Sequence, residues 1–272
     1  MQVQLEQRIM TSFLLKVDNA LQQASGFTNQ TINFYPAYSD YANRYVYTAN
    51  TRPLCNDTSV SGATIISGLM LNQSPVLVGE SGLLAINHYK GAVYFSSALP
   101  KGITISGSGA RKEVNVKLTD QTDWHLMYES QYHPQPINSP TGLPLDLETT
   151  PIVFLRFRGM ENKPLCFAKL DNQSMMIRGI IVANNEFQKI SITSILKNLN
   201  YTTIPLVTST PFDAVGNMTG LNYNYNQLTL DTSYTPMILS VRIIDQPSTG
   251  PYASVARNMA IADFEISTFA KS

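Results

Sequence analysis

Three histidines are the first residues in this chain whose side chains could do chemistry, because imidazole serves as a metal ligand and as a general base. They are His88, His125 and His133. The last two are eight residues apart in a segment expected to be strand and loop, whereas a zinc-binding helix pairs histidines four apart. No HExxH or HxH pair occurs, so the sequence predicts no metal site.

Paired carboxylates are the next candidates, since two acids about 5 to 9.5 Å apart can hydrolyse a glycosidic bond. Asp120 and Asp123 flank a predicted turn, and Asp146 and Glu148 follow a proline-rich segment. Acids in turns commonly cap backbone amides, which is the structural alternative. A hydrolase built on a β-sandwich requires Asp146 and Glu148 to face one cleft.

Nucleophile and phosphate-binding motifs are missing from the sequence. Ser106 to Gly109 does not match GxSxG, and Gly107 to Lys112 lacks the glycine and lysine spacing of a phosphate-binding loop. Cys55 and Cys166 belong to no CxxC or Cys/His grouping, so we expect two buried or incidental thiols. The sequence therefore predicts no catalytic residue, no cofactor and no small-molecule substrate, and a chain that is not an enzyme.

The charge balance argues against two classes of partner. Nineteen basic and nineteen acidic residues cancel, so no basic surface is predicted for nucleic acid or an anionic membrane. Charged residues are 14% of the chain, against about 25% in a typical soluble domain, and such a neutral polar surface suits packing against other subunits. No apolar run reaches the roughly 18 residues of a membrane span. The N-terminus lacks a signal-peptide pattern, which predicts synthesis in the cytoplasm.

An amphipathic helix is predicted from Val3 to about Ala24, ended by Gly26. Its apolar stripe recurs every four residues: Leu5, Ile9, Phe13, Val17 and Leu21. Burying each of these side chains stabilises the fold by roughly 1.5–3 kcal/mol, so the stripe must dock on a partner surface. That surface is either the chain's own sheet or a neighbouring subunit, and the stripe is a candidate interface.

Tyrosines supply a second set of candidate contacts, because an aromatic ring with a polar tip suits a half-exposed interface. Four lie in the first aromatic segment, residues 27–52, and two lie in an Asn-rich stretch, residues 216–230, that is expected to be an exposed loop. They are Tyr35, Tyr38, Tyr41, Tyr45, Tyr223 and Tyr225. An aromatic loop that closes over the end of a sheet is an equal alternative for the first segment.

The apolar pattern predicts a mainly β fold, with one or two β-sandwich-like modules, the N-terminal helix and one short helix in the second half. Leu83 to Phe95 is expected to form a hairpin with Gly91 in its turn. The stretch from Met175 to Ala183 is expected to be a central strand, and Phe187 to Leu199 the short helix. The predicted divisions are residues 1–26 (helix), 27–133 (first β module), 134–150 (proline-rich connection) and 151–272 (second β module).

Two segments resemble virion proteins of tailed bacteriophages. Residues 82–95 are similar to a hairpin that recurs in those proteins, and Ala98-Leu99-Pro100-Lys101-Gly102 matches the turn that follows it. Residues 164–199 are similar to neck and tail-completion subunits. The resemblance implies a non-enzymatic subunit in a ring at the neck (a head-tail connector) or along the tail. It also implies contacts with copies of itself and with other virion proteins, and assembly in the host cytoplasm.

A carbohydrate-binding or adhesion module is the alternative from a different class. Trp124 and exposed tyrosines would stack on sugar rings in such a module. This hypothesis requires an accessible Trp124.

Overall fold

A computed structural model of the chain describes residues 5–39, 45–51, 53–122, 126, 150–164, 171–208, 211–212, 219–245 and 258–270. The helices are α1 (Leu5–Gln23), α3 (Glu186–Lys197) and the short 3-10 helix η1 (Tyr225–Gln227). The first seven strands are β1 (Phe27–Ser39), β2 (Tyr45–Ala49), β3 (Gly68–Leu71), β4 (Ser74–Leu77), β5 (Leu83–Asn87), β6 (Ala92–Phe95) and β7 (Ile105–Lys112). The others are β8 (Asn115–Leu118), β9 (Ile152–Pro164), β10 (Asp171–Val182), β11 (Tyr234–Asp245) and β12 (Met259–Ala270).

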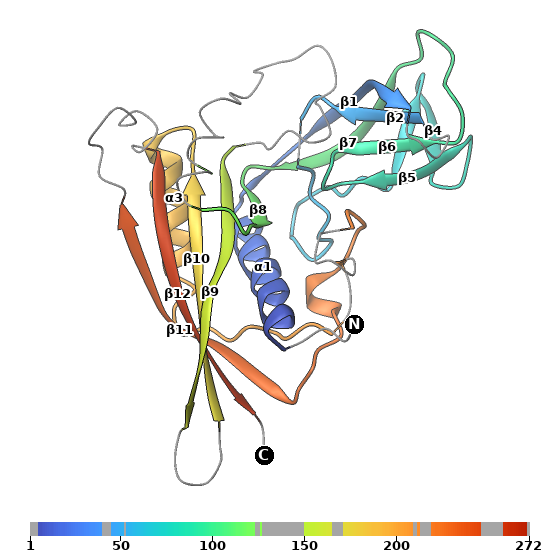
Figure 1. Ribbon diagram of the computed structural model, residues 1–272. Helices are drawn as coiled ribbons and strands as arrows, with labels where there is room; N and C mark the ends of the chain where they lie inside the picture. The colour runs from blue at the N-terminus through green and yellow to red at the C-terminus, as the bar shows by residue number, and fades with distance from the viewer. Residues whose placement is uncertain are drawn as a thin grey trace.

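The mainly β fold with an N-terminal helix and one further α-helix is confirmed (Figure 1). The strands form a seven-stranded sheet in the order β4-β3-β7-β1-β2-β6-β5 and a five-stranded sheet in the order β11-β12-β10-β9-β8. β10 lies in the middle of the second sheet, as its apolar sequence predicts. The first aromatic segment forms β1 and β2, which pair with each other.

The seven-stranded sheet curls around a single apolar core. Its two edge strands, β4 and β5, are consecutive in sequence and are joined by the turn at residues 78–82. Every strand contributes to the core, through Ile32, Phe34, Tyr47, Ala49, Leu69, Val76, Leu83, Ile86, Val93, Phe95 and Ile105. The predicted hairpin is confirmed as β5 and β6, with Gly91 at a positive φ of 55° in the turn.

The five-stranded sheet carries both α-helices on one face. Alternate residues of β9, β10 and β12 point toward the helices, as the two-residue period of a strand requires. Asn185 immediately precedes α3, and its side chain accepts a hydrogen bond from the backbone N–H of Gln188 and caps the helix. On the opposite face a smaller cluster contains Leu126, Ile152, Phe154, Ile180, Val182 and Met259.

One strand crosses the expected division between the two β modules. β8 lies within the predicted first module, residues 27–133, yet it pairs in parallel with β9 in the second sheet. Val116 of β8 packs in the core beneath the helices, and this burial holds the strand in the second sheet. The proline-rich connection, residues 134–150, therefore does not separate the two sheets, and except at residue 150 it lies outside the described residues.

Candidate functional site

The stripe of α1 packs against the chain's own five-stranded sheet. Ile9, Phe13 and Val17 are fully buried and Leu21 is nearly so, while Leu5 is partly buried against the same core. The ring of Phe13 meets that of Phe264 on β12, with centroids 4.8 Å apart in an edge-to-face arrangement. Of the two expected destinations, the sheet is the one observed, so these side chains are not interface candidates in this fold.

The tyrosines that were predicted as contact residues differ in their exposure to solvent. Tyr35 on β1 is half-buried and Tyr45 on β2 is exposed, so both reach the surface. Tyr223 is buried, which corrects the expectation of an exposed loop, and Tyr225 is half-buried against the core of the second sheet. The side chain of Tyr38 and the whole of Tyr41 lie outside the described residues.

A buried ion pair joins α1 to the end of β7. Lys112 Nζ lies 2.8 Å from Asp18 Oδ2 and 3.0 Å from Oδ1, and both side chains are at most 3% exposed. The same carboxylate accepts hydrogen bonds from Gln22 Nε2 at 2.8 Å and from the Tyr223 hydroxyl at 3.3 Å. A buried charge needs this degree of hydrogen bonding, because each unsatisfied group would lose its hydration without replacement.

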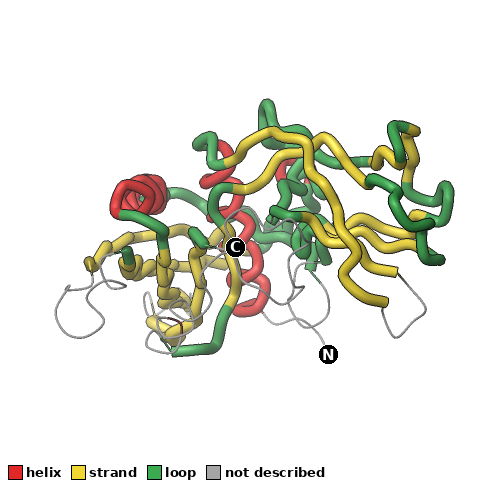
Figure 2. Tube along the Cα trace, turned by 90° about the horizontal axis from the view of Figure 1, so that it is seen from above, coloured by secondary structure: helices red, strands yellow, loops and turns green. Residues whose placement is uncertain are grey.

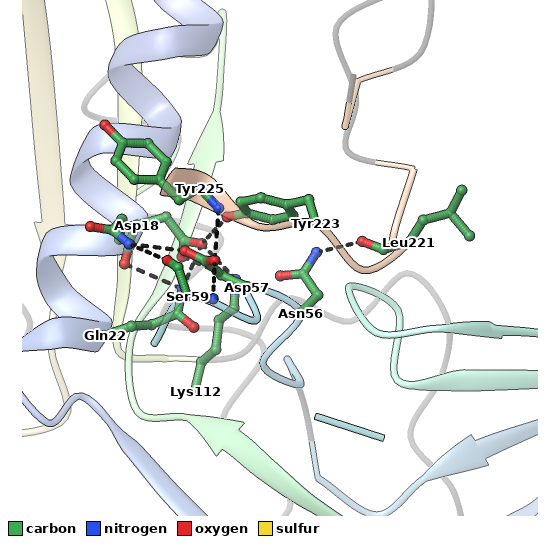
Figure 3. A network of polar contacts seen from close by, with 10 residues as sticks. Asp18, Gln22, Asn56, Asp57, Ser59, Lys112, Leu221, Tyr223 and Tyr225 are labelled. Carbon is green, nitrogen blue, oxygen red and sulfur yellow. Dashed lines mark hydrogen bonds and ion pairs between the residues drawn. The ribbon is translucent and has the colours of Figure 1, made fainter. Parts of the chain in front are cut away.

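A second buried carboxylate, Asp57, lies in the same network (Figure 3). Its Oδ1 accepts from the backbone N–H groups of Ser59 at 2.9 Å and Tyr225 at 3.0 Å, and its Oδ2 accepts from Asn19 Nδ2 at 2.9 Å. We call this network the polar junction; its residues are Asp18, Asn19, Gln22, Asn56, Asp57, Lys112 and Tyr223. It joins α1, the loop after β2, the end of β7 and residues 219–225.

Residues 219–223 are attached to the seven-stranded sheet by further contacts. His88 donates its backbone N–H to the Gly220 carbonyl at 2.9 Å, and its ring nitrogens lie 3.0 Å from the same oxygen and 2.9 Å from the Ile66 carbonyl oxygen. Tyr223 donates its backbone N–H to the Asn56 carbonyl oxygen at 2.9 Å. His88 is therefore a buried structural residue rather than a metal ligand.

The chemistry of the polar junction is structural. Burial raises the pKa of Tyr223 well above its usual value, and the Asp18 and Asp57 carboxylates raise it further, so the phenol stays protonated. Burial also raises the pKa of the nearby Cys55 thiol to about 12, which removes the thiolate a nucleophile needs. The junction joins the two sheets through the ion pair of Asp18 with Lys112 and through the hydrogen bonds of Asp57, and all three of these side chains are buried.

Sequence reasoning missed this junction. The signal was present only as a polar residue within an apolar pattern, Asp18 beside Val17 of the helical stripe. The members come from positions as far apart as 18 and 223, and nothing in the chain pairs them before folding.

A polar hollow of about 600 Å³ lies on the second sheet, toward the far end of the β9–β10 hairpin. Its lining includes Arg158, Glu161, Met176, Arg178, Asp263 and Glu265. Arg178 donates from Nε to Asp263 Oδ1 at 2.7 Å and from a terminal nitrogen to Oδ2 at 2.9 Å, a bidentate pair that occupies both carboxylate oxygens. Asp263 is therefore held as a structural ion pair across β10 and β12.

The remaining candidates for chemistry are not brought together. Asp120 is exposed after β8. Within the part of the chain that the structure describes, no three His, Cys, Asp or Glu side chains gather as a metal site. The other predicted candidates lie outside the described residues: His125, His133, Asp123, Trp124, Asp146, Glu148 and Cys166. The hydrolase and carbohydrate-binding hypotheses therefore stay predictions.

Two groups of exposed apolar side chains stand apart from these polar features. The first, which we call the β4–β5 patch, consists of Leu77, Val78 and Leu84 at the turn between those strands, with Met70 on β3 and Pro75 on β4. Their neighbours Leu69, Val76, Leu83 and Ile86 point into the core of the curled sheet, so the alternation of each strand places the patch outside. The side chain of Leu77 lies over Gly68, and a glycine has no side chain that could shield Leu77 from water.

The second group lies on α3 and consists of Phe187 and Ile190; together with the exposed Lys197 we call it the α3 stripe. Phe187 is 82% exposed and Ile190 is 55% exposed. The opposite side of the helix is buried through Ile192 and Leu196. The helix therefore has one apolar side in the core and a second in water.

The chain matches no protein-family model, no curated protein and no solved structure. Among the described residues, no helix combines the length and the hydropathy needed to cross a bilayer.

Proposed function

We propose that this chain is a non-enzymatic structural subunit of a tailed-phage virion. It assembles in the host cytoplasm and forms a ring at the neck or tail through contacts with copies of itself and with other virion proteins. The resemblance of residues 82–95 and 98–102 to virion proteins of tailed phages, and of residues 164–199 to neck and tail-completion subunits, supports the assignment to a virion.

The β4–β5 patch is the observation that carries the role in assembly. Met70, Leu77, Val78 and Leu84 are 37%, 55%, 49% and 45% exposed. Several large apolar side chains exposed on neighbouring strands favour the binding of another molecule, because their hydration is unfavourable. The low charge content of the chain also favours protein partners, since a neutral polar rim is desolvated at little cost.

The internal chemistry supports a structural role. Asp18 and Lys112 of the polar junction form an ion pair, Asp57 accepts hydrogen bonds from two backbone N–H groups and from Asn19, and the thiol of Cys55 is held protonated by burial. This network joins the two sheets through buried polar contacts. A subunit that transmits contacts from one neighbour to the next requires its two sheets to be joined.

The oligomeric state of the purified full-length chain tests the proposal. Size-exclusion chromatography with light scattering is expected to give a mass that is a multiple of 30.1 kDa at micromolar concentration. Immunogold labelling of tailed particles from cells that carry the gene is expected to mark the neck or tail. A chain that stays monomeric and is absent from particles would overturn the proposal.

The patch itself is tested by Leu77→Asp with Leu84→Asp, which places two charges in a surface that must be desolvated. The matched control is Leu221→Asp, because Leu221 is 59% exposed and lies outside the patch. We expect the double variant to lose self-association while the control keeps it. Circular dichroism of both variants verifies that the fold is intact.

A further inference from the structure

The α3 stripe and the β4–β5 patch lie at opposite ends of the molecule. Figure 1 shows α3 on one side of the molecule and β4 and β5 on the other, with α1 between them, and Figure 2 shows the two sheets side by side from above. Because they are far apart, the two surfaces of one chain cannot cover each other. Between two copies they can, when the α3 stripe of one copy meets the β4–β5 patch of the next.

The α3 stripe has the composition of a binding helix. Ile190 and Lys197 are seven residues apart, so they lie on nearly the same side of the helix, and Phe187 is one turn before Ile190. A large aromatic side chain that is mostly exposed is the kind of anchor that dominates the energy of an interface. The apolar pair is followed along the helix by one cation.

The β4–β5 patch carries the opposite charge. Glu80 lies in the turn, and its Oε2 accepts a hydrogen bond from the backbone N–H of Leu77 at 3.0 Å. This bond holds the carboxylate beside the apolar side chains. Glu80 is exposed and is the only charged residue between positions 53 and 89 apart from Asp57, which is buried in the polar junction.

The cation of the stripe is available for this carboxylate. Among the described residues Lys197 forms no ion pair, whereas Lys189 on the buried side of α3 lies 3.3 Å from Asp245 and 4.0 Å from Glu186. Glu186 is at the other end of the helix from Lys197. The charges therefore give the docked helix a direction, with its C-terminal end toward Glu80.

We propose that the α3 stripe of one copy docks on the β4–β5 patch of the next, with Lys197 paired to Glu80. This inference rests on the proposed function and specifies the self-contact that it requires. The contact joins two different surfaces, so a pair of copies keeps one free β4–β5 patch and one free α3 stripe. Such a heterologous contact closes into a ring when the rotation between neighbours allows it, and otherwise continues as a filament.

Complementation between two variants tests this geometry. One variant carries Phe187→Asp and Ile190→Asp, and the other carries Leu77→Asp and Leu84→Asp. We expect each variant alone to be monomeric by light scattering. An equal mixture is expected to form a one-to-one dimer and nothing larger, because only one of the possible contacts remains intact. Circular dichroism and thermal unfolding of each variant establish that the exposed substitutions leave the fold unchanged.

A charge exchange tests the pairing of Lys197 with Glu80. Lys197→Glu and Glu80→Lys are each expected to weaken self-association about fivefold, the effect of a surface ion pair worth roughly 1 kcal/mol. The chain with both substitutions is expected to recover the wild-type affinity. Added salt is expected to reduce the difference between wild type and single variants, because exposed charges are screened.

The outcomes separate the two proposals. If the wild type assembles and both apolar variants still assemble alone, the contact assigned here is wrong and the structural role stands. If one variant assembles and the other does not, assembly does not need both surfaces, and the heterologous contact is wrong. If the wild type does not assemble and is absent from particles, the proposed function itself fails.

Discussion

Asp18 on α1 and Lys112 at the end of β7 form a buried ion pair with an Nζ–Oδ2 distance of 2.8 Å. α1 belongs to the core of the five-stranded sheet, and β7 belongs to the curled sheet. The pair therefore couples the two halves of the molecule, and the loss of either charge is expected to affect both.

Asp18→Ala is expected to lower the free energy of unfolding by about 3–5 kcal/mol, because it leaves the Lys112 ammonium buried without its partner. Urea denaturation measures the change. The matched control combines Asp18→Ala with Lys112→Met, which removes both charges and is expected to recover much of the stability. A single variant as stable as the wild type would contradict the assignment of a closed, water-free pair.

His88 is expected to make the fold sensitive to acid. Burial is the main cause that lowers its folded-state pKa below 6.5, and Lys112 lowers it further, while the bonds to the Ile66 and Gly220 carbonyls raise it. The folded state then binds fewer protons than the unfolded state. The contribution to stability is complete above pH 6.5 and is lost as the pH falls from 6.5 through the folded-state pKa.

Thermal unfolding between pH 7.5 and 5 measures this dependence. His88→Gln is expected to be less stable at neutral pH but to lose less stability on acidification, because its side chain does not titrate. Equal slopes for wild type and variant would show that another group is responsible.

Cys55 is expected to be inert in the native state. Its thiol is buried and its pKa is raised to about 12, so almost no thiolate exists at pH 8. Alkylation by iodoacetamide, followed by mass spectrometry, measures this in a Cys166→Ser background, where a single thiol remains. We expect labelling only after denaturant is added, and rapid labelling of the native chain would contradict the structure.

Gly220→Ala is expected to lower the free energy of unfolding by more than the strain of an alanine at a positive φ accounts for. Gly220 has φ of +77°, and a Cβ there would overlap the side-chain amide of Asn87. Gly79→Ala is the matched control, because Gly79 has φ of +95° and nothing within 4 Å of the added Cβ. The control is expected to cost on the order of 1 kcal/mol.

Adding Asn87→Ala to Gly220→Ala tests the origin of the difference. We expect the second substitution to relieve part of the extra loss, because it removes the atoms that the new Cβ meets. Identical unfolding free energies for Gly220→Ala and Gly79→Ala would mean that residue 220 is free to move away from the curled sheet.

Local patterns in the sequence determined the elements of this protein. A stripe of apolar residues four apart predicts α1, the alternation around Gly91 predicts the β5–β6 hairpin, and the spacing of Ile192 and Leu196 predicts α3. Each of these signals lies within a few residues, and the backbone responds to it through the helical or two-residue period. The mainly β fold class follows from the sum of such segments.

Only the tertiary structure decided where those elements dock and which polar groups meet. The α1 stripe suits a neighbouring subunit as well as the chain's own sheet, and the choice depends on the apolar surface that β9, β10 and β12 form together. Asp18, Lys112 and Tyr223 are brought into contact by the packing of whole elements over more than 200 residues of sequence. Burial and long-range pairing depend on the three-dimensional arrangement of every element, and a local sequence pattern does not specify that arrangement.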